Sequence, residues 1–367
     1  MPAGFAFDIL AREGAARCGR LSTPHGTIDT PAFLCVATFG AVRGVAPDEL
    51  EQLGAQMLLA NTYHLGERPG EQVVAAQGGL HGFTGWRRPW LTDSGGYQVT
   101  SLVDRMRVEE EGIRFTSTLD GTRRLLTPES AIATQEALGA DIAMVLDECR
   151  PAKGDDADGT LGLEIAMERS LRWAERSRQA HKRPDQALFG IVQGGLSEGL
   201  RRRSARATLA IGFDGLAHGG LGLGEDPERR MELVTAVHDE APDQTPRYLM
   251  GLGKPVDLLD GIACGVDLFD CVVPTRNGRH GQLFTSEGTL QIRSARYKND
   301  PAPPDADCDC PTCARFSRAY LCHLIRSEEA LGARLASIHN IRFYLRLLER
   351  ARRAITAGRF AALRRAY

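Results

Sequence analysis

The stretch VDLFDCVVPTRNGR, residues 266–279, is the starting point for the fold and the function. A largely apolar run from Val266 to Phe269 ends at Asp270, and an arginine-bearing loop is expected directly after it. The pattern predicts a buried strand with a carboxylate where the strand leaves the core. Asp93 closes PWLTD and Asp147 closes DIAMVLD in the same way. Three carboxylates that each close a hydrophobic run predict one concave site built from several strand ends.

Short β-rich apolar runs alternate with amphipathic helical segments along most of the chain. Alternation of this kind indicates a parallel sheet, and eight repeats over about 250 residues favour a closed (β/α)8 TIM barrel of the α/β class. An open, doubly wound sheet is the alternative. The eight expected strands are residues 30–38, 56–62, 89–93, 141–147, 187–193, 213–220, 247–253 and 266–273. Thr127 and Ser197 are expected at helix N-termini.

Composition sets limits on the kind of protein. The chain has 367 residues, 43% of them hydrophobic and 25% charged, with a formal net charge of −2. No apolar run approaches the roughly 20 residues of a membrane span, and no signal peptide is recognisable, so we expect a cytoplasmic protein without membrane contact. Because the net charge is near zero, any nucleic acid must be bound by a local basic patch. One candidate is Arg276, Arg279 and His280, with Arg293, Arg296 and Lys298 a little later; another is the C-terminal stretch with Arg352, Arg353, Arg359, Arg364 and Arg365. A solvated surface is the alternative for both.

Cysteine spacing predicts a metal site. The odd total of nine argues against a disulfide framework, but Cys308, Cys310 and Cys313 form C-x-C-x-x-C. Three thiolates on one turn favour zinc, and a closed tetrahedral site requires a fourth ligand. The candidates for this fourth ligand are Cys322, His323 and His339. We expect His339, which is interpreted as lying at a junction before a helix; a redox role for the cysteines is the alternative.

The zinc site defines the expected domain organisation. A barrel is expected over residues 1–280, with its last helical unit resuming around 340–367, and a zinc-binding subdomain over 281–339 that begins with a hairpin at 281–297. Residues 109–121 are expected to form a smaller hairpin inside the barrel. Residues 150–160, RPAKGDDADGT, read as a long polar loop.

Polar side chains beside the strand ends suit a planar base. Tyr97 can stack on such a ring, and Gly95 and Gly96 let the backbone approach a ligand closely. Ionised Asp147 is an acceptor that fits the adjacent N–H donors of a guanine-like edge, and Gln193 can both donate and accept.

These motifs together resemble the family of tRNA-guanine transglycosylases, also called queuine tRNA-ribosyltransferases. The resemblance extends from about Gly26 to Phe360 and rests on NTYHL, RPG, DSGGYQ, LDEC, GIVQGG, GGLGLGE, RYLMGLG, FDCVVPTRNGR and CDCPTC with His339. It implies a (β/α)8 barrel with an inserted zinc-binding subdomain near the C-terminus and one structural Zn²⁺ per chain. It further implies exchange of guanine at the wobble position of tRNA for a deazaguanine base, and a homodimer.

The resemblance also implies roles for individual residues. Asp270 would be the nucleophile that attacks the wobble ribose, and Asp93 the general acid/base. The residues that would bind or frame the base are Asp147, Gln193, Gly220, Leu221, Tyr97 and Met250, with Glu225 supporting the peptide that faces it. Arg276 and Arg279 would grip the anticodon loop.

Two positions resemble the bacterial branch of the family. Cys149 follows Asp147-Glu148, and Leu223 stands where bacterial members carry a bulky aliphatic residue, which implies 7-aminomethyl-7-deazaguanine rather than queuine as the substrate. Leu223 in place of the more usual valine leaves the width of the base pocket open. Tyr97 stands where the family often has phenylalanine, and Cys35 and Thr100 also depart from the pattern.

Three other functions compete with this one. A non-catalytic tRNA-binding subunit of the same fold would be expected to lack the nucleophile, whereas Asp93 and Asp270 are both present. A relative acting at another position or on another nucleic acid is a second alternative, although the chain has no spare length for extra RNA-binding domains. The third alternative is an unrelated barrel glycosidase acting on free sugars. The cysteine cluster and the residues expected to bind a planar base argue against it.

Overall fold

Eight parallel strands form the centre of the molecule, a computed structural model that describes residues 2–103, 105–150 and 159–367. The strands are β4 (Ala32–Val36), β5 (Leu58–Ala60), β6 (Trp90–Thr92), β10 (Ile142–Met144), β11 (Ala187–Val192), β12 (Gly215–His218), β13 (Arg247–Leu249) and β14 (Leu268–Cys271). Each lies inside one of the eight segments predicted from the sequence. All six residues of β11 are buried, as expected for a parallel strand covered on both faces.

The sheet is closed, which excludes the open doubly wound alternative. The last strand, β14, pairs in parallel with the first, β4, with Asp270 opposite Leu34. The predicted (β/α)8 barrel is therefore confirmed.

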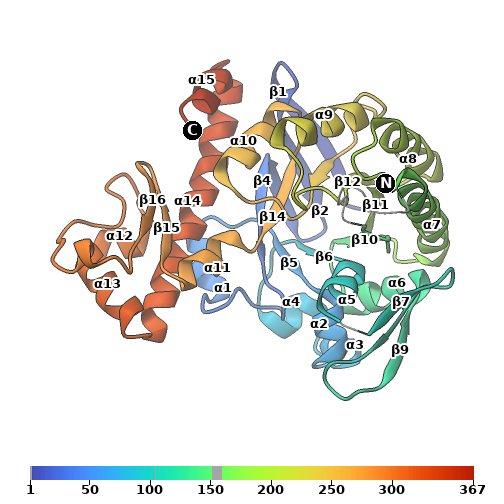
Figure 1. Cartoon of the computed structure of the whole chain (residues 1–367), viewed down its shortest axis with the longest axis horizontal. Helices are drawn as coiled ribbons and strands as arrows, with labels where there is room; N and C mark the ends of the chain where they lie inside the picture. Colours follow the sequence, from blue (N-terminus) through green and yellow to red (C-terminus); the bar gives the residue numbers. More distant parts are fainter. Residues whose placement is uncertain (1, 104, 151–158) are drawn as a thin grey trace.

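Helices surround the barrel in the order expected for repeated strand–helix units (Figure 1). Thr127 and Ser197 are N-caps, as predicted, with side chains that accept from Ser130 N and Leu200 N. The helices of this part of the chain are α1 (Pro47–Gln52), α2 (Thr62–Glu67), α3 (Glu71–Ala76), α4 (Gly79–Thr84), α5 (Gly96–Leu102), α6 (Pro128–Leu138), α7 (Gly159–Ala180), α8 (Glu198–Ile211), α9 (Pro227–His238), α10 (Pro255–Ala263) and α11 (Val273–Arg279).

An N-terminal antiparallel sheet, which sequence reasoning missed, covers one end of the barrel. It consists of β1 (Ala6–Glu13), β2 (Ala16–Thr23) and β3 (Gly26–Thr30). Its Phe7 and Leu21 pack in the same core cluster as Leu34 of β4. Arg17 donates to Asp267 at 2.9 Å, and Asp267 directly precedes β14. The sheet therefore lies at the amino ends of the barrel strands and leaves the carboxyl ends free for a site.

The segment between β6 and α6 carries more structure than the predicted hairpin. The hairpin expected at 109–121 is wrong in its bounds: those residues contain one strand, β8 (Ile113–Thr116), which pairs on either side with β7 (Met106–Val108) and β9 (Arg123–Leu126) in a three-stranded antiparallel sheet. Of the polar loop expected at 150–160, residues 151–158 lie outside the described part of the chain.

A small subdomain follows α11 and projects from one side of the barrel (Figure 1). It contains the predicted hairpin, now β15 (Gln282–Thr285) and β16 (Gly288–Gln291), the short helix η1 (Ala295–Tyr297), α12 (Pro311–Arg315) and α13 (Arg318–Arg326). The 27-residue helix α14 (Ala330–Thr356) then runs from the subdomain along the barrel, and α15 (Phe360–Arg365) ends the fold. The expected boundary at residue 339 falls inside α14, so one continuous helix serves both parts.

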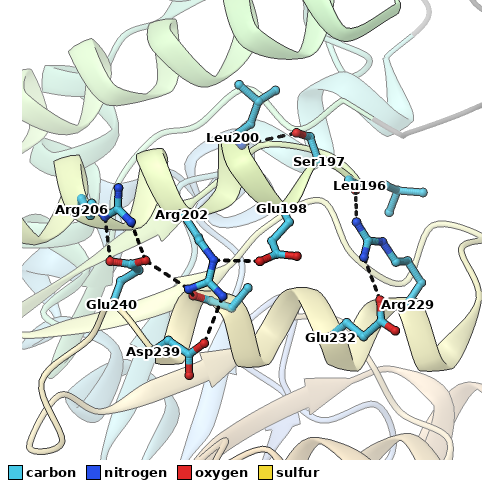
Figure 2. A network of polar contacts seen from close by, with 11 residues as sticks. Leu196, Ser197, Glu198, Leu200, Arg202, Arg206, Arg229, Glu232, Asp239 and Glu240 are labelled. Carbon is cyan, nitrogen blue, oxygen red and sulfur yellow. Dashed lines mark hydrogen bonds and ion pairs between the residues drawn. The ribbon is translucent and has the colours of Figure 1, made fainter.

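Ion pairs tie α8 to α9 on the outer face of the barrel (Figure 2). Arg202 contacts Glu198, Asp239 and Glu240, and Arg206 contacts Glu240 as well. A surface hollow of about 530 Å³ lies beside this network, and none of its lining residues is a predicted site residue. Within the described residues, no helix has both the length and the apolar character needed to cross a membrane.

Candidate active site

Strand alternation directs the predicted catalytic carboxylates into the mouth of the barrel. Phe269, directly before Asp270, faces outward, because its ring lies against Gly261 of the outer helix α10. Leu268, two residues before Asp270, therefore faces inward. Because side chains alternate along a strand, Asp270 lies on the same inner face as Leu268. The same reasoning applies to Asp93, because the preceding Thr92 faces outward and donates to Gln135 Oε1 of α6 at 3.0 Å. Both carboxylates therefore face the barrel axis at its carboxyl end.

Asp270 is held by two donors on a single oxygen. The Tyr248 hydroxyl donates to Oδ1 at 2.7 Å, and Gly251 N donates to the same atom at 2.8 Å. Among the described residues, none donates a hydrogen bond to Oδ2, which leaves that oxygen available to a substrate. Burial raises the pKa of Asp270, and the bonds from Tyr248 and Gly251 oppose that rise.

Asp93 is enclosed more fully. It accepts from Asn61 Nδ2 at 2.6 Å, from Thr62 N at 3.0 Å and from Gly95 N at 3.1 Å. Burial raises the pKa of Asp93 to about 7; the backbone donors oppose this, and the charge of nearby Asp270 adds to it. A carboxylate that titrates near neutral pH suits general acid/base catalysis, because both of its protonation states are populated.

Asp147 and Gln193 form a directly bonded polar pair at the ends of neighbouring barrel segments. Gln193 Nε2 donates to Asp147 Oδ2 at 2.5 Å, and both side chains are buried. Burial raises the pKa of Asp147 to about 6, and the Gln193 bond lowers it. Gly219 and Gly220 lie against this pair: a Cβ on Gly219 would come within 2.4 Å of Gln193 Nε2. Because these two glycines have no side chains, their backbone lies directly against the Asp147–Gln193 pair.

Glu225 organises the loop that follows β12. Its carboxylate accepts from Gly222 N at 2.6 Å and Leu223 N at 3.0 Å, and Arg230 Nε donates to it at 2.6 Å. These bonds, with burial opposing them, lower the pKa of Glu225, so it is held as an anion. The peptide groups it supports come just after Gly220 and Leu221, the ones expected to face a base.

The remaining expected base contacts differ in exposure. Tyr97 lies in the first turn of α5 with 48% of its surface exposed, as a stacking platform requires. Met250 follows β13, is half-buried and packs against the core cluster that contains Leu34 and Leu268, whereas Leu221 is buried.

The arginines after Asp270 lie on a helix rather than on the expected loop. Residues 273–279 form α11, because Pro274 is compatible with the first turn of a helix, where its missing N–H costs no hydrogen bond. Arg276 is exposed and Arg279 is partly buried. Burial lowers the pKa of Arg279, and the charges of Arg43 and Arg276 add to this. None of the ion pairs formed among the described residues involves these three arginines, so they make a positive patch at α11, the helix that follows the strand of Asp270.

The cysteine cluster has the composition and spacing of a zinc site. The ligand atoms of Cys308, Cys310, Cys313 and His339 all lie within 4.8 Å of one another, and all four residues are buried. Cys313 Sγ lies 3.2 Å from His339 Nδ1. Bonds of ~2.3 Å to sulfur and ~2.0 Å to nitrogen around a tetrahedral ion imply ligand separations of this size. The residues therefore fit a structural Zn²⁺ that joins the subdomain to α14.

The location of His339 corrects one expectation. It lies in the interior of α14, not at a junction between helices, because the sequence around it continues a helix rather than ending one. Its Nε2 lies 2.8 Å from the Phe284 carbonyl oxygen, which leaves Nδ1 for the metal. The two other candidates, Cys322 and His323, lie on α13 and are not part of the cluster.

Two residues that hold the carboxylates were not predicted. Tyr248 is a fully buried residue within β13, and nothing in an apolar strand distinguishes its hydroxyl from an ordinary core tyrosine. Asn61 was included only within the motif NTYHL. Its Oδ1 caps α2 by accepting from His64 N at 3.1 Å, which fixes its amide nitrogen toward Asp93.

Together these features define a class. The chain is a (β/α)8-barrel enzyme with two carboxylates of raised pKa at its mouth, an adjacent polar pair that can read a planar ligand, and a basic patch at the rim. Active sites of such barrels lie at this face, and a pair of carboxylates is the catalytic group of most glycoside hydrolases.

Comparison with known proteins identifies the family. Residues 12–367 match the family model described as Queuine tRNA-ribosyltransferase. The chain is 52% identical over 363 residues to the queuine tRNA-ribosyltransferase of Thermus thermophilus, covering 99% of this chain and 93% of that protein. It is 50% identical over 356 residues to the one from Chromohalobacter salexigens, covering 97% and 95%. The chain belongs to the queuine tRNA-ribosyltransferase family, whose members are pentosyltransferases.

Proposed function

We propose that this enzyme exchanges guanine at the wobble position, position 34, of tRNAs with G-U-N anticodons for 7-aminomethyl-7-deazaguanine, a step of queuosine biosynthesis. The observation that carries the proposal is the pair Asp93 and Asp270 in the mouth of the barrel. One is poised to exchange a proton near neutral pH, and the other has an oxygen free to attack.

The first half-reaction breaks the bond between the base and the ribose. Oδ2 of Asp270 attacks C1′ of the wobble ribose, the C1′–N9 bond breaks, and its electron pair leaves with guanine. Asp93 in its protonated form donates the proton that neutral guanine requires. The product is a ribosyl ester of Asp270, so one difficult displacement is divided into two easier ones.

The second half-reaction installs the new base. Asp93, now ionised, takes the proton from N9 of the incoming deazaguanine, and N9 attacks C1′ and displaces the Asp270 carboxylate. Two inversions at C1′ restore the original configuration, as in retaining glycosidases. Tyr248 and Gly251 stabilise the departing carboxylate by donating hydrogen bonds to Oδ1.

The base is bound by the polar pair and the loop after β12. Asp147 accepts from the adjacent N–H groups of the guanine-like edge, Gln193 supplies a further hydrogen bond, and the backbone of Gly220 and Leu221 faces the ring. Tyr97 and Met250 cover the two ring faces. Leu223, on the loop anchored by Glu225, limits the space for a substituent, which favours the small aminomethyl group over the larger one of queuine.

The RNA is bound at the rim. Arg276 and Arg279 contact phosphates of the anticodon loop, and the wobble nucleotide leaves its stack to reach the carboxylates. The Cys3His cluster holds one structural Zn²⁺ that keeps the subdomain in place beside this patch. We further propose that the enzyme acts in the cytoplasm as a homodimer.

Incorporation of labelled guanine tests this function. Unmodified tRNA with a G-U-N anticodon should incorporate the label, and the same tRNA with adenine at position 34 should not. Addition of 7-aminomethyl-7-deazaguanine should then displace the label irreversibly, whereas queuine should not. Absence of incorporation into the guanine-bearing tRNA would contradict the proposal, and displacement by queuine alone would contradict the assigned base.

A further inference from the structure

A second cluster of metal-ligating side chains lies at the end of the barrel opposite the carboxylates. His25 lies in the turn between β2 and β3, His81 lies in α4, and Asp141 directly precedes β10. Their ligand atoms all lie within 4.8 Å of one another. Three separate elements, the N-terminal sheet, an outer helix and a barrel strand, therefore meet at one point.

The carboxylate at the centre of this cluster is firmly oriented. Asp141 is fully buried at its side chain, and Trp90 N donates to its Oδ2 at 2.9 Å. His25 approaches the other oxygen, with Nδ1 2.9 Å from Oδ1. Support of a carboxylate by a backbone donor is typical of metal ligands, because it fixes the direction in which the remaining lone pairs point.

His81 supplies the observation that points to a ligand. It is 7% exposed, and its Nε2 lies 3.3 Å from Asp141 Oδ2 without forming a hydrogen bond to any described residue. A buried imidazole nitrogen that lies near a carboxylate without forming a hydrogen bond costs free energy. A cation bound between this nitrogen and the carboxylate would remove that cost.

We propose that His25, His81 and Asp141 bind a divalent transition metal ion of the Zn²⁺, Co²⁺ or Ni²⁺ type. Two imidazoles and one carboxylate are a ligand set that suits these ions and not Mg²⁺ or Ca²⁺, which prefer oxygen ligands. With three protein ligands the ion keeps an open position for water. A hollow of about 260 Å³ opens beside the two imidazoles and is lined by His25, His81 and Arg183 among others.

The stacking of the two imidazole rings means that metal binding requires a side-chain rotation. The imidazoles of His25 and His81 have centroids 3.5 Å apart and planes 18° from parallel, so one ion cannot lie in both ring planes. One ring must turn. His25 can do so, because its side chain is 36% exposed and lies in a turn, whereas His81 is enclosed. The ion would therefore close a clamp between the N-terminal sheet and the barrel.

Cobalt binding to the zinc-loaded protein tests the proposal. We expect a second equivalent of metal whose spectrum lacks sulfur-to-cobalt charge-transfer bands, unlike cobalt in the Cys3His site. His25→Gln should weaken this binding by about ten-fold or more, and binding should weaken below the pKa of free histidine, since protons compete for the same nitrogens. His323→Gln, the same change at an exposed histidine of α13, should bind cobalt as the wild type does.

Thermal unfolding distinguishes a metal site at His25, His81 and Asp141 from a cluster held together by hydrogen bonds alone. Added Co²⁺ should raise the Tm of the wild type and of His323→Gln, but not that of His25→Gln. Two results would overturn the proposal. One is the absence of a second bound equivalent at about millimolar Co²⁺, far above the affinity of ordinary protein sites. The other is binding by His25→Gln at wild-type affinity. His25 is the residue changed because its exposure lets the variant fold.

Discussion

At the scale of single residues, Asp93 and Asp270 show how environment separates two identical side chains. Asp93 receives three hydrogen bonds and is buried, and its pKa rises to about 7. Asp270 receives two bonds on one oxygen and keeps the other free. Burial raises the pKa of both, but the two carboxylates differ in their hydrogen bonds, and carboxylates in different environments can take different steps of one reaction.

Tyr248→Phe tests how much the hydroxyl contributes to the nucleophile. A hydrogen bond to a charged group contributes ~1.5–3 kcal/mol, so we expect turnover to fall by roughly 10- to 100-fold. Since that bond lowers the pKa of Asp270, its loss should also shift the acidic limb of the rate profile to higher pH. Tyr320→Phe on α13 is the control. An unchanged pH profile in Tyr248→Phe would show that the tyrosine only fills space.

The raised pKa of Asp93 predicts a pH dependence for guanine release. Asp93 must be protonated to donate to the leaving base, and that form is lost as pH rises through about 7. Single-turnover release of guanine should therefore slow as pH rises through this range. A rate that stays constant between about pH 6 and 8 would remove Asp93 from the role of acid, because a group with this pKa changes protonation state there.

The strand-end carboxylates could be recognised from the sequence because a charged side chain at the end of an apolar run is costly to bury and is therefore seldom found there without a function. Tyr248 and Asn61 could not be recognised, because their importance depends on which atoms lie beside them in the folded chain. Roles for Asp93, Asp147 and Asp270 entered by resemblance to a family, and the structure supplies their hydrogen bonds and burial.

At the scale of elements, the eight barrel strands were predictable because each is a continuous apolar run, as burial on both faces requires. The N-terminal sheet was missed because its strands combine apolar and polar residues instead of forming continuous apolar runs. β1 alternates between exposed and partly buried residues, and the polar Arg17 of β2 is buried by its bond to Asp267. The helix α11 was expected as a loop because proline and glycine lie within seven residues.

Cys310→Ser tests whether a bound metal ion stabilises the small subdomain. Loss of one thiolate should abolish metal binding and lower the Tm by an amount on the order of 10 °C, because metal binding contributes directly to folding. Cys322→Ser should retain zinc, since Cys322 lies outside the cluster. Metal analysis and thermal unfolding check both variants. A metal-free Cys310→Ser with wild-type stability would show that the ion has no structural role.

At the scale of the whole molecule, positive and negative side chains nearly balance. The net charge of −2 gives no general attraction to RNA, so under the proposed function we expect tRNA binding to depend on the patch at Arg43, Arg276 and Arg279. Elsewhere many arginines are paired with carboxylates, as on α8 in Figure 2. Arg43, Arg276 and Arg279 form no such pair among the described residues, so their charges are available to an anionic ligand.

Substitution of the patch arginines tests this arrangement. Arg276→Ala and Arg279→Ala should each weaken tRNA binding and reduce the slope of log K against log salt by about 0.7–0.9, the contribution of one phosphate contact. Arg206→Ala removes an arginine that is already paired with Glu240 and should leave the slope unchanged. Equal slopes in all three variants would place the RNA on another surface.

The most direct test of the central claim is isolation of the covalent intermediate. Enzyme incubated with unmodified G-U-N tRNA and then denatured should retain a protein–RNA adduct, and peptide analysis should locate the ribose on Asp270. Asp270→Asn should yield no adduct and no exchange, whereas Asp48→Asn, at an exposed aspartate of α1, should behave as the wild type. An adduct in Asp270→Asn, or guanine exchange at the wild-type rate by that variant, would contradict the mechanism.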